Sequence, residues 1–220
     1  MSSSDNILDF WFHNITDEIP IDKKSPPASL WFNGGRKFDD EIRQKFESAW
    51  REAKGGGLKD LEATARGRLA LIILFDQFSR NMFRNTPQAF ATDVLALELA
   101  ASSIREGIDQ KLALIERVFL YMPFMHSEAL GVQEEGVRRF ESLVEESRTK
   151  APHNTSYFEY NLTYAKRHRD IIAQFGRFPR RNKIADGLKT LVGLGIILEA
   201  RHAIARDLVG VEAQFLHPET

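Results

Sequence analysis

Hydrophobic residues recur at intervals of three and four along most of the chain, which is the spacing of one face of an α-helix. From Phe38 to Trp50 this spacing predicts an amphipathic helix that ends at the glycine run 55–57. The segment 61–81 shows the same spacing and becomes almost wholly apolar at 69–75, which is typical of a helix buried on most sides. No window alternates strictly enough to predict a half-buried strand, so the sequence predicts an all-α fold.

Capping and helix-breaking residues predict the remaining elements. The predicted helices are a short one carrying 7–12, one that begins at Thr86 and Pro87 and runs to Gly107, one over 111–121, one capped by Ser127, and one over 156–174. Pro123 is expected to end the helix over 111–121. Helices of this length joined by short loops predict antiparallel pairs, as in tetratricopeptide-like helical bundles. The tail 184–220 is apolar but rich in glycine, and is atypical of the rest.

Length and composition limit the class of protein. A chain of 220 residues with 43% hydrophobic residues is large enough to form one domain over residues 1–220 without disulfides or metals. Its net charge of −1 argues against nucleic acid or an anionic membrane as the partner. The longest apolar stretches are far shorter than the ~20 residues that span a bilayer. The absence of cysteine and of a secretory signal pattern predicts a cytoplasmic protein.

The first polar cluster follows the buried run and consists of residues 76–84. Helical spacing would put Asp76, Arg80 and Arg84 on one face, and Gln77 and Asn81 four residues apart on a neighbouring one. A carboxylate, two guanidinium groups and two amides so close to an apolar helix predict the wall of a binding pocket. An ion-paired helix end, in which Asp76 neutralises Arg80, is the alternative.

The second cluster, 121–128, surrounds Pro123. If the proline ends the helix, His126 lies on a tight connection from which its side chain can reach a cleft. Histidine is the side chain whose ordinary pKa lies nearest to neutral pH, and Glu128 or Gln133 is a candidate to orient it. We therefore predict His126 and Glu128 as catalytic residues. The alternative is a histidine that binds a neighbouring carbonyl.

The third cluster runs from His168 to Asn182. Gly176 allows a left-handed turn after the helix, and the arginines that follow, among them Arg177 and Arg181, create a local positive potential. Arginine binds carboxylate or phosphate with two parallel hydrogen bonds, so His168, Arg177, Arg181 and Asn182 are predicted ligand-binding residues. The same arginines could instead pair with carboxylates elsewhere in the chain.

Motifs for other chemistry are missing. No HExxH or comparable spacing joins His126, Glu128 and His168, so the sequence predicts no metal site. It also contains no GxSxG nucleophile elbow, phosphate-binding loop or dinucleotide fingerprint, so no cofactor is expected.

The clusters and their order resemble the DUF924 family, an uncharacterised family similar to tetratricopeptide-like helical proteins. The matching residues are 8–12, Trp31, Phe32, Phe38, Asp39, 69–81, 89–93, 119–128, Gln133, His168 and 175–182. The resemblance covers about residues 6–183, and implies a helical fold and characteristic polar residues but no activity. Ser79 and Arg180 depart from it, because the family pattern has proline and histidine at these positions.

Three functions are compatible with the sequence. In the first, the three clusters converge into a pocket that binds a small anionic molecule, with His126 as general acid or base for hydrolysis or isomerisation. In the second, a helical-repeat surface binds a peptide or a partner helix through exposed Trp11, Trp31 and Trp50, although core packing is the more common place for tryptophan. In the third, the clusters are only ion-pair networks between helix ends.

Overall fold

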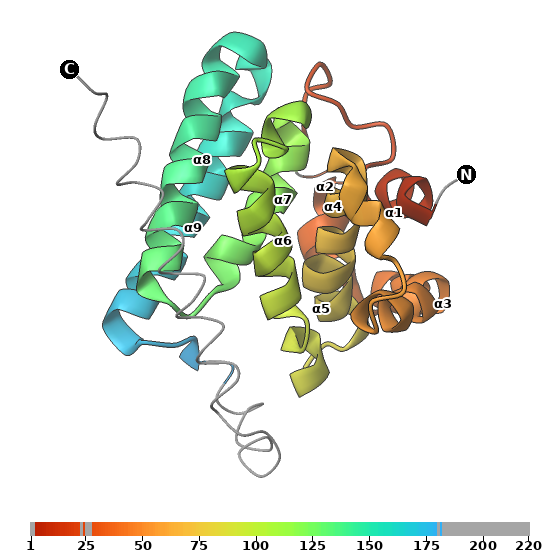
Figure 1. The fold of residues 1–220 in the computed structure, drawn as a ribbon. Coiled ribbons are helices and arrows are strands. Elements are labelled where there is room, and N and C mark those ends of the chain that lie inside the picture. Colours follow the sequence, from red (N-terminus) through yellow and green to blue (C-terminus); the bar gives the residue numbers. More distant parts are fainter. Residues whose placement is uncertain (1–2, 23, 25–27, 180, 182–220) are drawn as a thin grey trace, which may run out of the picture.

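The computed structural model describes residues 3–22, 24, 28–179 and 181, and these residues form helices with no β-strand (Figure 1). The predicted all-α class is confirmed. The α-helices are α1 (Ser3–Phe12), α2 (Ala28–Asn33), α3 (Gly35–Lys54), α4 (Ala65–Ile72), α5 (Ser79–Met82), α6 (Asp93–Arg105), α7 (Leu114–His126), α8 (Leu130–Lys150) and α9 (Thr155–Phe175). Short helical turns are η1 (Lys59–Ala63), η2 (Ile73–Phe78), η3 (Pro87–Phe90), η4 (Asp109–Lys111) and η5 (Pro152–Asn154).

The apolar run 69–75 lies at the centre of the molecule, as predicted. α4, η2 and α5 follow one another without a break in helical structure, and every residue from Leu69 to Ser79 is buried. α4 contacts α1, α6 and α7, while η2 contacts α3 and α6. Because neighbours surround this segment, it has no solvent-facing side on which polar residues would be required.

Aromatic side chains fill the core between α1, α2 and the central segment. Trp11 and Trp31 are stacked, and each meets Phe119 of α7 edge to face. The Trp31 indole Nε1 donates to the Trp11 carbonyl oxygen at 2.7 Å, which satisfies that buried donor. Trp50 is equally buried and packs against Phe83. The three tryptophans therefore lie in the core and are not exposed anchors for a peptide.

α7, α8 and α9 form the other half of the molecule, where α8 lies beside α9 and also contacts α7 (Figure 1). The expectation that Pro123 ends the helix is wrong, because α7 continues through it to His126. Proline removes one backbone hydrogen bond, but every residue from Leu114 to Met125 is buried, and this packing outweighs the loss. His126 is thus the last residue of a buried helix.

Two other predicted boundaries also change. Thr86 and Pro87 begin only the short turn η3, and the long helix starts six residues after Pro87, at Asp93. Ser127 does not cap α8, because Ala129 occupies the capping position. The Ser127 hydroxyl oxygen accepts a hydrogen bond from the backbone N–H of Ala129. The predicted tail 184–220 lies outside the described residues. Within them, no helix is both long and apolar enough to cross a membrane.

Candidate functional site

The centre of the candidate site is a π-helical turn, η2, in the middle of the buried segment. Such turns insert an extra residue into a helix and are frequent at functional sites. The hydroxyl groups of Ser79 and Thr92 both donate to the Phe75 carbonyl oxygen, at 2.5 and 2.7 Å. Ser79 therefore supplies a side-chain hydrogen bond where the helical ladder is distorted. The turn places Asp76 in the core with almost no exposure.

Asp76 holds two basic side chains from different parts of the chain. Nδ1 of His126 lies 2.8 Å from Oδ1 and 3.0 Å from Oδ2 of Asp76, and Nη1 of Arg80 lies 3.0 Å from Oδ1. Gln77 Nε2 donates to Oδ2 at 2.6 Å. An ionised carboxylate only accepts, so Nδ1 of His126 must carry the proton, and the lone pair of the neutral ring is on Nε2.

Asp93, at the start of α6, connects the first cluster to the third. Its two oxygens accept from Nη1 and Nη2 of Arg80 at 2.9 and 3.1 Å. Oδ2 also lies 3.3 Å from Nη1 of Arg181, whose Nη2 donates to the His126 carbonyl oxygen at 3.1 Å. Sequence reasoning missed Asp93 as a site residue, although it lies in the segment 89–93 that matches the family.

Aromatic rings complete the surroundings of Arg181. Its guanidinium carbon lies 4.4 Å from the Phe90 ring centroid and 4.8 Å from that of Phe178. The His168 ring is 5.4 Å from Phe178 and 6.3 Å from His126, and its Nδ1 donates to the Tyr164 carbonyl oxygen at 2.8 Å. The central cluster is thus defined by Asp76, Arg80, Asp93, His126, His168 and Arg181.

Burial and charge set the protonation states of this cluster. Burial alone would raise the pKa of Asp76, but the positive charge of Arg80 and the hydrogen bonds from His126 and Gln77 outweigh it and lower that pKa to about 2. Burial and the charge of Arg80 lower the pKa of His126 despite the neighbouring Asp76. Burial also lowers the pKa of His168, to about 4. Both rings are therefore neutral near pH 7, while the carboxylate stays ionised.

The predicted partners of His126 have other roles. Asp76 takes the position that the sequence suggested for Glu128, whose Oε1 instead accepts a hydrogen bond from the backbone N–H of Phe178 at 3.1 Å. Gln133 donates to the carbonyl oxygens of Met125 and Ser127, both at 2.6 Å, and so fixes the turn between α7 and α8. Neither side chain orients the imidazole, because burial brings the carboxylate of the π-helical turn closer.

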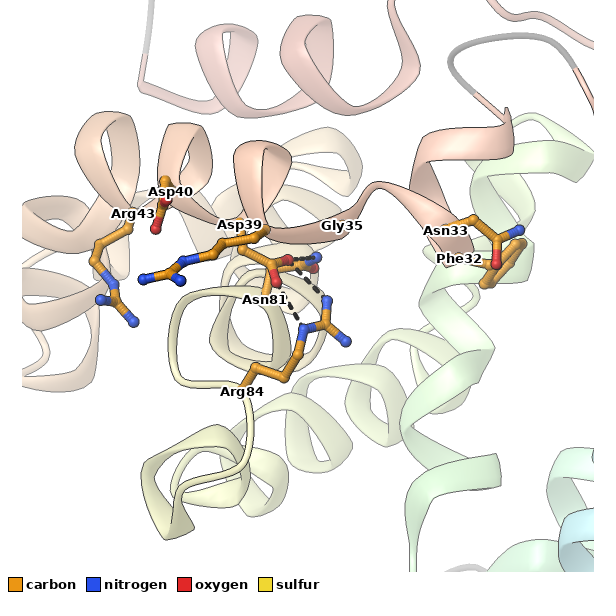
Figure 2. A pocket seen from close by; sticks show the side chains of 9 residues that line it. Phe32, Asn33, Gly35, Asp39, Asp40, Arg43, Asn81 and Arg84 are labelled. Carbon is orange, nitrogen blue, oxygen red and sulfur yellow. Dashed lines mark hydrogen bonds and ion pairs between the residues drawn. The ribbon is translucent and has the colours of Figure 1, made fainter.

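Other predicted residues lie apart from this cluster. Asn81 and Arg84 both bind Asp39 of α3 and line a different cavity (Figure 2). The expected common face fails for Arg84 because α5 ends at Met82, and Phe83, with φ −118° and ψ 31°, leaves the helical conformation before Arg84. Arg177 is exposed, while Asn182 and Arg180 lie outside the described residues. Within those residues, no group of three or more acidic or histidine side chains could hold a metal ion.

The chain is similar in sequence and in fold to other proteins. A structure of a protein of unknown function from Agrobacterium tumefaciens is similar, with 33% sequence identity and a TM-score of 0.65 over 91% of this chain and 96% of that one. No curated protein matches the chain. A family model described as a bacterial protein of unknown function, DUF924, matches residues 7–190. The chain is therefore a member of the DUF924 family.

Proposed function

We propose that the chain binds a small anionic molecule beside His126 and transfers a proton to or from it, as in a hydrolysis or an isomerisation. The observation that carries this proposal is the hydrogen bond from Nδ1 of His126 to the ionised Asp76. It leaves the lone pair on Nε2, for which no described residue provides a donor, and 17% of the side chain is exposed. A neutral imidazole held by a buried carboxylate is a suitable general base.

Arg181 is the side chain that we assign to the anion. Arg80 already binds both oxygens of Asp93, the Asp76 carboxylate and the Asp76 carbonyl oxygen, so its donors are largely occupied. Among the described residues, the hydrogen-bond acceptors of Arg181 are Asp93, at the longer distance of 3.3 Å, and one carbonyl oxygen. An anion could therefore compete for the spare N–H groups of Arg181 at lower cost.

The main alternative is that the cluster is a structural ion-pair network, since its charged groups neutralise one another. A peptide-binding module has less support, because its proposed tryptophan anchors are buried. The tetratricopeptide-like arrangement of antiparallel helix pairs stays a prediction.

A thermal-shift screen with inorganic phosphate, phosphomonoesters and small carboxylates tests the proposal. A ligand that binds only the folded state raises the melting temperature, and we expect such a rise for the wild type and for the matched control Arg177→Gln, whose arginine is exposed. Arg181→Gln should reduce this rise, and His126→Gln should stop any turnover of the ligand. A network without ligand function would give no stabilising compound, and a rise unaffected by Arg181→Gln would contradict the assigned site.

A further inference from the structure

A polar cavity away from the central cluster, which we call the α3 cavity, lies where α2, the start of α3 and the end of α5 meet (Figure 2). Its volume is about 600 Å³, within the range of small-molecule sites. The lining residues that matter here are Phe32, Arg36, Asp39, Arg43, Asn81 and Arg84. None of them belongs to the central cluster.

Asp39 fixes one wall of the α3 cavity. Its carboxylate accepts from Nε and Nη2 of Arg84 at 2.6 and 2.8 Å, and from Nδ2 of Asn81 at 2.7 Å. Figure 2 shows these two side chains meeting on Asp39. Arg84 keeps three further N–H groups, because a guanidinium has five. The amide oxygen of Asn81, a side chain more than nine-tenths buried, has no donor among the described residues.

Arg36 and Arg43 supply positive charge that the described structure does not neutralise. Neither forms an ion pair with a described residue, and Arg43 has only a distant contact, 5.9 Å, to the Phe83 ring. With Arg84 they give the cavity three guanidinium groups against the two carboxylates of Asp39 and Asp40. The first turn of α3 contains no acidic residue, although the helix dipole favours negative charge there. The cavity thus has an excess of donors and of positive charge.

Phe32 gives the same cavity an apolar surface. Its side chain is 51% exposed, whereas the adjacent Trp31 is buried in the core. A large aromatic ring beside unpaired arginines suits a ligand that has both an anionic end and a flat apolar part.

We infer that the α3 cavity binds a small phosphomonoester or similar dianion that carries a planar apolar group. Arg36, Arg43 and the free N–H groups of Arg84 bind the anionic oxygens. The planar group contacts Phe32, and the Asn81 amide oxygen accepts from a hydroxyl or amine of the ligand. This inference rests on the α3 cavity alone and is independent of the function proposed for the central cluster.

Calorimetric titration with phenyl phosphate and methyl phosphate at low salt tests the inference. We expect Arg36→Gln and Arg43→Gln each to weaken binding of both compounds about 3- to 10-fold, because each removes a charged donor. Lys37→Gln is the matched control: it removes the same charge one residue away, outside the cavity lining, and should change the affinity less than about twofold. Phe32→Ala should remove the preference for phenyl over methyl phosphate.

Several results would overturn the inference. These are no binding of phenyl phosphate up to about 10 mM, an equal loss in Lys37→Gln and Arg36→Gln, or a preference for the phenyl group that survives Phe32→Ala. Binding lost in Arg181→Gln and kept in Arg36→Gln would move the anion to the central cluster. All of these substitutions except Arg181→Gln replace exposed side chains, so the variants should fold and the outcome can be interpreted.

Discussion

The segment 76–84 contributes to both regions, with Asp76 and Arg80 in the central cluster and Asn81 and Arg84 in the α3 cavity, yet the charged groups of the two regions differ in their partners. Around Asp76 the carboxylates and guanidinium groups are largely buried and bound to one another. Around Asp39 one ion pair is formed, and Arg36 and Arg43 are left without a described partner. Buried charges must be neutralised, whereas water solvates exposed ones. The comparison teaches that charge density alone does not say how many donors remain for a ligand: in the central cluster they are chiefly those of Arg181, and in the α3 cavity those of Arg36, Arg43 and Arg84.

The largest expected difference between the two regions is in the free energy of unfolding. Asp76→Asn would remove the buried carboxylate that Arg80 and His126 share, leave Asp93 as the one carboxylate on Arg80 among the described residues, and should destabilise the protein by about 3 kcal/mol. Asp39→Asn should cost less than about 1 kcal/mol, because its partner Arg84 is about half exposed. Urea unfolding followed by circular dichroism measures both values. Equal losses in the two variants would mean that burial does not separate the regions.

The pH dependence of stability should come from the central cluster, since the α3 cavity contains no histidine. The pKa values of His126 and His168 are lowered in the folded state, to about 4 for His168, so the unfolded chain binds protons first as the pH falls. Stability should be complete above about pH 6.5 and decrease below it, by at most about 1.4 kcal/mol per pH unit for each proton. Asp76, with its pKa of about 2, stays ionised throughout this window.

Urea midpoints at several pH values between about 7.5 and 5 measure this slope. His168→Gln keeps a donor for the Tyr164 carbonyl oxygen but removes one titrating group, so its slope should be smaller. An unchanged slope in this variant, or stability that rises as the pH falls, would be inconsistent with two neutral buried imidazoles.

The smallest expected effect on the free energy of unfolding comes from the arginines of the α3 cavity. Arg36→Gln and Arg43→Gln should each change the free energy of unfolding by less than about 0.5 kcal/mol, because no described ion pair is lost. The same denaturation experiment measures them. A loss above about 1 kcal/mol would show that these arginines stabilise the fold and that their charged groups are not available to a ligand.

Helical periodicity was enough to predict the class, the buried run 69–75 and the helix α9, because apolar spacing reflects burial directly. The polar clusters, read separately from that periodicity, singled out Asp76, Arg80, His126 and Arg181, which the fold brings together. Helical periodicity could not predict that α7 passes through Pro123, since that depends on tertiary packing.

The sequence also could not predict which side chain binds His126 or where Arg84 lies. Asp76 lies beside His126 in place of the predicted Glu128 because of the π-helical turn. Arg84 lies apart from Asp76 because α5 ends at Met82. The π-helical turn changes the helical phase of the residues around it, and the helix end takes Arg84 off the helical face altogether, and neither is recorded by spacing along the sequence.

The claim on which the proposed chemistry depends is that Asp76 holds His126 as a neutral ring with its proton on Nδ1. Long-range ¹⁵N–¹H NMR of the imidazole resonances, assigned with His126→Gln, tests it directly. The account predicts a protonated Nδ1, an unprotonated Nε2 and a pKa below the ordinary 6.5. A proton on Nε2, or titration at or above pH 6.5, would contradict it.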